Sequence, residues 1–464
     1  MHLGIDYHAV LRRALRRGGD YADLFVEAND PLAIICEDDR IERIVSGQER
    51  GAGLRLITGL KTAYAFTNEL TTSALLELAD AVSTGVAVRD GGAPTTLSLT
   101  RLRPAAPSAI RIAPEAVSVD QKVSMVTRAN RIARAWDPQI RQVLVSYREN
   151  RQKVLIVNTD GMMREDERCY LTALVHVVAA GTDGTIQTGY EAVGGLTGLE
   201  LFEAEPFEQA AGTAARRAVM MLTARKAPAG KMAVVLSSAA GGTMIHEAVG
   251  HGLEADLAQS GLSVYSGKLG QQIASPLITV LDDATLPGRR GSFSCDDEGT
   301  SAQRTVLVDR GVLKTYLYDR LTAMKDGLRS TGNGRRESYR SRPIPRMTNT
   351  MIAPGSTPPA DILRATPKGL YVMKMGGGQV NTVNGDFVFE VSEGYRIENG
   401  RIGEPVRGAS LIGNGPTVLN SIDLVGSDLG FSIGTCGKDG QGSPVSDAQP
   451  TLRIPEITVG GEVV

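Results

Sequence analysis

Cysteine is scarce in this chain of 464 residues, which contains only Cys36, Cys169, Cys295 and Cys436. No two of them form a CxxC pair. Small secreted scaffolds, by contrast, contain closely spaced cysteines that form several disulfides. The spacing therefore argues against a dense disulfide framework and favours a reducing compartment such as the cytoplasm.

Long apolar runs are also missing. The longest run, near residues 171–180, contains His176 and is much shorter than the ~20 residues needed to span a bilayer. Near the start, Asp6 and the arginine pairs at 12–13 and 16–17 leave no apolar core typical of a signal peptide. We expect a soluble, cytoplasmic protein with no membrane partner.

An excess of positive charge is absent as well. Lys and Arg number 50 and Asp and Glu number 52, which gives a formal net charge of −2. Because nucleic-acid phosphates bind to a basic surface, we expect no nucleic-acid partner. No GxGxxG follows a predicted strand, and we expect no GxSxG nucleophile turn, which disfavours a dinucleotide-binding fold and a serine hydrolase.

Glycine, by contrast, is abundant, with 53 of 464 residues, or about 11% against a usual level of about 7%. This abundance indicates many tight turns and much antiparallel sheet. Ala227-Pro228-Ala229-Gly230 interrupts the pattern and predicts a domain boundary. We predict an α+β protein. Its mixed α/β N-terminal domain covers residues 1–226, with an exposed connection at about 91–117. Its largely antiparallel β C-terminal domain covers residues 231–464 and carries the metal-site helix described below.

Within these domains, apolar periodicity predicts several elements. Helices are expected over about residues 1–20, 72–88 and 202–226. Ser118 and Gln121 form a capping-box pattern that predicts another helix, ending near residue 136. Short, separate strands are expected at residues 24–26, 33–36, 53–57 and 62–66. Asn399-Gly400 predicts a hairpin in the C-terminal domain.

The most informative segment contains two of the five histidines. A buried strand predicted at residues 233–236 leads into a helix, on which His246, Glu247 and His251 lie off the apolar stripe. Imidazole is a preferred zinc ligand, and a neighbouring carboxylate suits a general base. We therefore predict a metal site here. The alternative is a set of polar residues on an exposed helix face, because short motifs also occur by chance.

The spacing of the two histidines differs from the His-Glu-x-x-His pattern, in which they are four residues apart. At ~100° per residue, an i,i+4 pair is offset by about 40° and an i,i+5 pair by about 140°. A regular helix would therefore point His246 and His251 apart. Either a π-bulge brings them into line, or the helix ends near Gly250 and His251 reaches back from a loop. Gly250 and Gly252 make distortion there less costly.

Cys436 is the best candidate for a third metal ligand. It lies in a glycine-rich stretch, residues 434–441, which predicts a turn where backbone can approach a metal. Lys438 nearby would favour the thiolate form. Alternatively, Cys436 is an inert buried thiol, as we expect for the other three cysteines. Glu254 is a ligand, a hydrogen-bonding partner of a ligand, or simply solvated.

These residues belong to a longer pattern that resembles the TldD/PmbA family, and specifically its TldD members. The match includes residues 246–254 and 436–438, and it extends through residues 296–299, 331–334 and 346–350. It covers essentially the whole chain. The resemblance implies an α+β N-terminal domain, a largely antiparallel C-terminal domain and metallopeptidase activity. It also implies Zn²⁺ held by His246, His251 and Cys436, with Glu247 catalytic.

The resemblance further implies a dimer, either with itself or with a TldE/PmbA-like subunit that lacks the metal motif. Members of the family act on unfolded peptides, in peptide-antibiotic maturation and antitoxin turnover. We therefore predict a zinc-dependent peptidase for short or unfolded peptides, in which Glu247 takes a proton from zinc-bound water.

Two alternatives stay open. One is a metal-dependent amide hydrolase that acts on something other than peptides. The other is a structural zinc site in a binding protein, although such sites have four protein ligands and only three are apparent here. The sequence does not give the physiological substrate or the cleavage preference.

Overall fold

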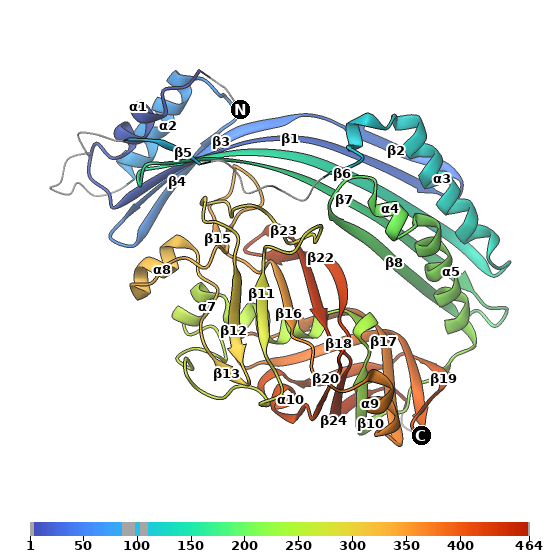
Figure 1. Cartoon of the computed structure of the whole chain (residues 1–464). Helices are drawn as coiled ribbons and strands as arrows, with labels where there is room; N and C mark the ends of the chain where they lie inside the picture. The colour runs from blue at the N-terminus through green and yellow to red at the C-terminus, as the bar shows by residue number, and fades with distance from the viewer. Residues whose placement is uncertain (1–3, 86–97, 103–109, 463–464) are drawn as a thin grey trace.

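The two halves of the chain form two bodies that pack against each other (Figure 1). The computed structural model describes residues 4–85, 98–102 and 110–462. The first half is a long, curved sheet with helices at both ends, and the second half lies on the concave side of this sheet. The predicted connection at about 91–117 lies partly outside the described residues, and the division into domains 1–226 and 231–464 stays a prediction.

The helices of the first half are α1 (Tyr7–Ala14), α2 (Thr72–Thr84), α3 (Val119–Ala135), α4 (Leu201–Ala204) and α5 (Phe207–Thr223). Its strands are β1 (Tyr21–Glu37), β2 (Arg40–Ser46), β3 (Glu49–Thr58), β4 (Lys61–Thr67), β5 (Thr100–Leu102), β6 (Ile140–Asn158), β7 (Met162–Ala180) and β8 (Ile186–Leu196). The sheet order is β4-β3-β1-β6-β7-β5, with β2 paired to β1 and β8 paired to β7. The capping box predicted at Ser118 and Gln121 is present at the start of α3.

The strands of this sheet are much longer than predicted. The runs at residues 24–26 and 33–36 are parts of one strand, β1. Along β1, the side chains of even-numbered residues such as Leu24 and Ile34 pack under the helices. Odd-numbered residues such as Asp23 and Phe25 face the second half, where Phe25 packs with Cys295. Because successive side chains of a strand point to opposite faces, one sheet packs against the helices on one face and against the second half of the chain on the other.

The helices of the second half are α6 (Thr243–Ile245), α7 (Ala255–Gln259), α8 (Arg320–Asp326), α9 (Pro359–Arg364) and α10 (Gly415–Ser421). The longer strands are β10 (Gly230–Leu236), β11 (Val280–Asp283), β12 (Arg304–Asp309), β16 (Asn349–Ile352), β17 (Lys368–Val380), β18 (Asp386–Glu398), β19 (Arg401–Arg407), β20 (Ser410–Asn414), β22 (Gly430–Lys438), β23 (Gln441–Gln449) and β24 (Leu452–Gly460). The two-residue strands are β9 (Arg225–Lys226), β13 (Val312–Leu313), β14 (Gly334–Arg335), β15 (Ile344–Pro345) and β21 (Leu424–Val425).

Two main sheets form the second half. One has the order β17-β10-β24-β20-β18-β19-β9, and the other has the order β13-β12-β11-β16-β23-β22. Most pairs are antiparallel, whereas β10–β17, β9–β19 and β16–β23 are parallel. The hairpin predicted at Asn399-Gly400 joins β18 to β19, and both residues have positive φ. The predicted α+β class with largely antiparallel sheets is confirmed.

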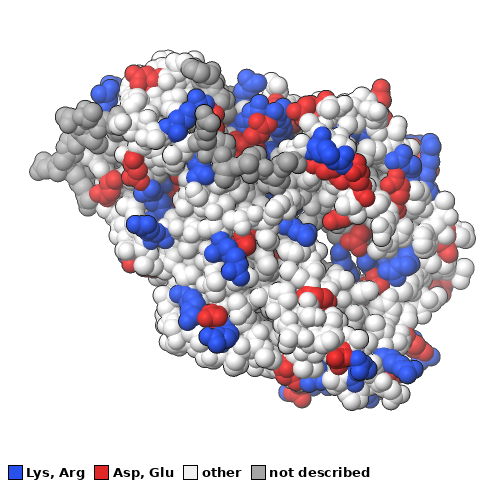
Figure 2. Space-filling view, in the orientation of Figure 1, with Lys and Arg blue, Asp and Glu red and all other residues white. Residues whose placement is uncertain are grey.

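Acidic and basic side chains are interspersed over the face of the molecule in view (Figure 2), as the balanced composition suggests. Within residues 4–85, 98–102 and 110–462, no helix is both long enough and apolar enough to cross a membrane.

Candidate metal centre

A distorted helix positions the two histidines of the motif. The α6 helix continues into a π-helical turn, His246–Gly250, and then into a short 3-10 turn, His251–Leu253. The backbone N–H of His251 donates to the carbonyl of His246, which is the i→i+5 bond of a π-turn. Of the two geometries predicted for this spacing, the π-bulge is therefore confirmed. Gly250 allows close packing at the turn, because a Cβ there would displace the end of the Met347 side chain.

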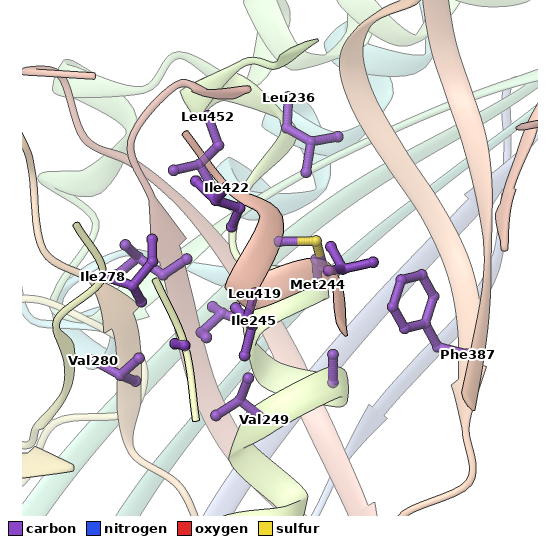
Figure 3. Packing of buried hydrophobic residues seen from close by; sticks show 14 of the residues in the cluster. Leu236, Met244, Ile245, Val249, Ile278, Val280, Phe387, Leu419, Ile422 and Leu452 are labelled. Atoms are coloured by element: carbon purple, nitrogen blue, oxygen red, sulfur yellow. The ribbon is translucent and has the colours of Figure 1, made fainter. Parts of the chain in front are cut away.

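The apolar side of this distorted helix is fixed in the main core of the second half. Met244, Ile245 and Val249 are buried there, and Figure 3 shows them among side chains from several other elements. Their neighbours in the cluster include Leu236, Ile278, Val280, Phe387, Leu419, Ile422 and Leu452. The anchored apolar stripe leaves His246, Glu247 and His251 on the side that lines a cavity.

Cys436 lies against both imidazole rings. Its Sγ is 3.2 Å from Nε2 of His246 and 3.4 Å from Nε2 of His251, and one ligand atom from each residue lies within 4.8 Å of the others. Tetrahedral zinc, with Zn–S near 2.3 Å and Zn–N near 2.0–2.1 Å, separates such atoms by about 3.5 Å. The donor set and the two sulfur–nitrogen distances therefore fit a zinc ion.

The local structure around Cys436 differs from the prediction. Cys436 lies on strand β22, and the turn follows only at Asp439 and Gly440, where both residues have positive φ. Because β22 is a regular strand, its register with β23 sets the position of Cys436, which pairs with Ser443. The turn predicted within residues 434–441 is therefore present, but Cys436 lies on the strand before it and not in the turn.

The surroundings of Cys436 favour the thiolate form of its side chain. Burial alone would raise its pKa, but hydrogen bonds and positive charge from His246 and His251 more than offset this and lower it to about 5. Lys438, which was predicted to favour the thiolate, is not among the leading causes of this shift. Its ammonium group instead contacts Glu254 at 3.1 Å and Asp256 at 2.7 Å.

Glu254 connects the two segments that carry the candidate ligands. Its carboxylate accepts a hydrogen bond from Nδ1 of His251 at 3.0 Å and contacts Lys438 on β22. Arg346 lies 3.9 Å from the same carboxylate and donates to the carbonyl of Cys436. Burial would raise the pKa of Glu254, but the charges of Lys438 and His251 lower it to about 2. Glu254 is therefore a charged partner of a candidate ligand and is not solvated.

Glu247 has no partner of its own. Within the described parts of the chain, its carboxylate makes no hydrogen bond or ion pair, and it lines the same cavity as His246, His251 and Cys436. Burial raises its pKa, while the positive charges of the two histidines act in the opposite direction. A free carboxylate beside a cluster of metal-binding atoms is available to accept a proton from water.

The cavity is large and is built from both halves of the chain. It has a volume of about 1240 Å³. The first half contributes residues of β8 and α5, and the second half contributes residues of β17 and β22 together with the histidine segment. Salt bridges tie the two halves together across this wall, since Arg217 contacts Glu393 at 2.7 Å and Lys374 contacts Glu191 at 2.7 Å.

The expectation that no GxSxG turn is present needs a correction. Gly430-Phe431-Ser432-Ile433-Gly434 matches that pattern in its letters. These residues lie within β22, however, and not at a strand-to-helix turn, which is what exposes a nucleophilic serine. The hydroxyl of Ser432 donates to Asp447 and not to a histidine. The structure therefore does not support a serine nucleophile.

Some residues of the site were missed by the sequence analysis. Asp447 lies 4.0 Å from Nδ1 of His246, and Arg346 contacts both Glu254 and Cys436. Neither stands in a local pattern that points to the histidines, because each is brought there by sheet pairing over long distances in sequence. Arg346 lies in a segment of the family resemblance, which was the only available signal.

Three family models match nearly the whole chain. They are the PmbA/TldA metallopeptidase domain 1 at residues 22–89, the central domain at residues 112–222 and the C-terminal domain at residues 229–461. Together with the fold, these matches define the protein as a metallopeptidase. The chain belongs to the PmbA/TldD family.

Individual relatives agree with this assignment. The Metalloprotease TldD homolog of Haemophilus influenzae is 38% identical, over 96% of this chain and 94% of its own length. The Zinc metalloprotease TldD homolog of Saccharolobus solfataricus is 32% identical, over 57% of this chain and 59% of its own length. The crystal structure of TldE from Thermococcus kodakarensis superposes with a TM-score of 0.75 at 16% identity, covering 98% of this chain and 99% of that one. The chain is thus a hydrolase with a metal cofactor, and its fold is shared with TldE.

Proposed function

We propose that this protein is a zinc-dependent peptidase that cuts short or unfolded peptides. The observation that carries the proposal is the convergence of His246, His251 and Cys436 within 4.8 Å, next to the unpartnered carboxylate of Glu247 in one cavity. Two imidazoles and a thiolate are ligands that suit zinc. The name of the Saccharolobus solfataricus relative includes zinc, which supports the choice of metal.

In the proposed mechanism, the metal and the side chains of the protein have separate roles. Zinc bound at the three ligands would supply Lewis acidity toward the peptide carbonyl and the attacking water. Glu247 takes the proton from that water and delivers it to the leaving amine. Glu254 accepts from Nδ1 of His251, which leaves Nε2 of that ring free to bind the metal. Because a thiolate ligand donates more charge than an imidazole, Glu247 carries more of the water activation.

The edge of β22 supports a peptide as the substrate. This strand is the last one in its sheet, and residues 431–437 all line the cavity, although successive side chains of a strand point to opposite faces. The cavity therefore borders the backbone edge of β22. An extended peptide can pair with such a free edge, and its backbone hydrogen bonds would hold it beside Cys436.

The two alternatives have less support. A structural zinc site needs four protein ligands, and among the described residues no fourth His, Cys, Asp or Glu joins the cluster. An amide hydrolase for small molecules would not need a cavity of about 1240 Å³ bordered by a strand edge. The peptidase proposal accounts for both features.

The third ligand can be tested by metal content. We expect about one zinc per chain in the purified protein, and we expect Cys436→Ser to lose most of it together with the peptidase activity. The reason is that the hydroxyl of serine is not ionised at neutral pH and is a poor zinc ligand. Elemental analysis after exposure to a weak chelator measures the occupancy.

Cys169→Ser serves as the matched control, because Cys169 lies on β7 and does not line the cavity. It should retain zinc. Full zinc occupancy and activity in Cys436→Ser would show that another group completes the site.

We also propose that the protein works as a dimer, with a second copy or with a TldE-like chain. The support is the family and the structural likeness to TldE. Light scattering at the working concentration, with activity measured on the same fractions, is the test. We expect the activity to elute at the mass of a dimer, and an active monomer would contradict the proposal.

A further inference from the structure

Arg289 is a cation in the cavity wall that the protein leaves without an anion. Within residues 4–85, 98–102 and 110–462, its guanidinium group makes no hydrogen bond or ion pair, and Glu205 acts on it only through a longer-range attraction. The other Lys and Arg side chains of the wall each form an ion pair. Arg216 and Arg217 contact Glu393, and Lys374 contacts Glu191.

The side chain of Arg289 is held in place by an aromatic ring. Its guanidinium carbon lies 3.7 Å from the centroid of the Phe431 ring, and both residues line the cavity. When an arginine stacks face to face on a ring, the N–H groups at its edge stay free to donate. The contact with Phe431 therefore holds the guanidinium group of Arg289 in the cavity wall, and its hydrogen-bond donors have no partner among the described residues.

The loop that carries Arg289 is fixed on both sides. The carbonyl of Gly288 accepts a hydrogen bond from Leu196 on β8 at 3.0 Å. The N–H of Arg290 donates to the hydroxyl of Ser446 on β23 at 3.1 Å. A donor group on a fixed backbone loses little conformational entropy when it binds, so the position is preorganised for a ligand.

Half-buried Arg290 and buried Arg335 lie next to this wall and add positive charge. Arg290 donates to the carbonyl of Gly434 at 3.2 Å, and Arg335 donates to the carbonyl of Pro444 at 2.6 Å. Neither forms an ion pair with a carboxylate of the described residues, and burial lowers the pKa of each. Uncompensated positive charge beside a cavity attracts anions into it.

We propose that Arg289 binds a carboxylate of the peptide substrate about four to five residues away from the bond that is cut. Phe431 and Cys436 lie on the same strand, five residues apart. At ~3.3 Å per residue, this separation is ~16 Å, which an extended peptide covers with about the same number of residues. The proposal rests on the proposed peptidase function and adds a determinant of specificity to it.

The carboxylate can be an acidic side chain or the C-terminal carboxylate of a short peptide. A planar guanidinium suits either group, because both accept two parallel hydrogen bonds. Because this contact is remote from the reacting atoms, it stabilises the bound substrate and the transition state equally. It should therefore lower KM and leave kcat unchanged.

The experiment compares two sets of peptides on three proteins. In the first set, an amidated neutral peptide carries one Glu, or Gln as its control, at each position up to six residues on either side of the scissile bond. In the second set, a free C-terminal carboxylate stands at the same distances. The proteins are the wild type, Arg289→Gln and Arg401→Gln, the last of which removes an exposed arginine on β19 that does not line the cavity.

In the wild type and in Arg401→Gln, we expect KM to fall about 10- to 100-fold when a carboxylate stands four to five residues from the cut, as for a hydrogen bond to a charged group. Arg289→Gln should lose this preference, so that its KM for the Glu peptides rises to that for the Gln peptides. The KM for each Glu peptide is divided by the KM for its Gln control on the same protein. Partial misfolding of a variant therefore does not affect this ratio.

The two peptide sets distinguish a side-chain carboxylate from a terminal one. A wild type without preference in either set, or an Arg289→Gln that keeps the preference, would overturn the subsite while leaving the peptidase intact. A wild type that carries zinc but cuts none of the peptides would overturn the proposed function itself, and the subsite with it.

Discussion

Glu247→Gln is expected to keep its zinc and its fold but to lose peptidase activity by about 10³-fold. Gln has nearly the shape of Glu but cannot accept a proton, and general-base catalysis contributes roughly 10²- to 10⁴-fold. The metal should stay because Glu247 is not among the three residues whose ligand atoms converge. The fold should also stay, because the carboxylate has no hydrogen-bond partner in the described structure that the substitution could remove.

Three measurements on the same preparation test this expectation. Elemental analysis gives the zinc content, thermal unfolding gives the stability, and a fluorogenic peptide gives kcat and KM. The loss should lie in kcat, because the base acts in the chemical step. Glu404→Gln, a surface substitution on β19, is the matched control and should behave like the wild type. Near-normal turnover in Glu247→Gln would favour a structural metal site.

The cluster of His246, His251 and Cys436 shows how far local sequence can be used to predict a site. The i,i+5 spacing of His246 and His251 is incompatible with a regular helix, and this conflict pointed to the π-turn that the structure contains. Cys436 was selected because glycines surround it, yet its position comes from the pairing of β22 with β23. The glycines around Cys436 do not explain its position. The strand pairing that does explain it cannot be read from the sequence.

The long strand β1 shows why the fold was predicted only in outline. Two short strands were predicted where the structure has only β1, and Asn29-Asp30-Pro31 between them has the composition of a turn. In the structure, β1 pairs with β3 up to Asn29 and with β2 from Leu32 onward. Pro31 lies at the change of partner, where its missing N–H breaks no ladder on that side. The α+β fold class was predictable from composition. The length of the strands was not, because it depends on pairing between distant parts of the chain.

Charged residues around the site were the least predictable part. Lys438 was expected to act on Cys436, but it binds Glu254 and Asp256. Lys438 and Cys436 are only two residues apart along the chain, yet Lys438 reaches the thiol only indirectly, through Glu254 and His251. Arg289 gave no signal in sequence, because its loop and strand β22, which carries Phe431, are more than a hundred residues apart along the chain. Electrostatic roles of this kind depend on three-dimensional contacts.

Compact folded proteins are expected to resist cleavage, while the same proteins supplied as unfolded fragments are cut. The candidate metal ligands line a cavity between the long sheet of the first half and the second half, with β8 on one side and β22 on the other. An extended chain can enter and pair with the edge of β22. A folded domain would first have to unfold, at a cost of ~5–15 kcal/mol. We therefore expect a rate difference of about 10³-fold or more.

The direct comparison uses one substrate protein, offered first in its native form and then as its own denatured, alkylated chain. Mass spectrometry locates the cuts, and the rates are compared at equal concentrations below KM. Glu247→Gln, incubated in parallel, corrects for any contaminating protease. The ratio of the cleavage rate of the denatured form to that of the native form should decrease when a destabilising substitution is made in the substrate protein. The reason is that the unfolded fraction of the native sample then rises. Equal rates for the native and denatured forms would mean that intact domains reach the histidine–cysteine cluster, and this would contradict the prediction.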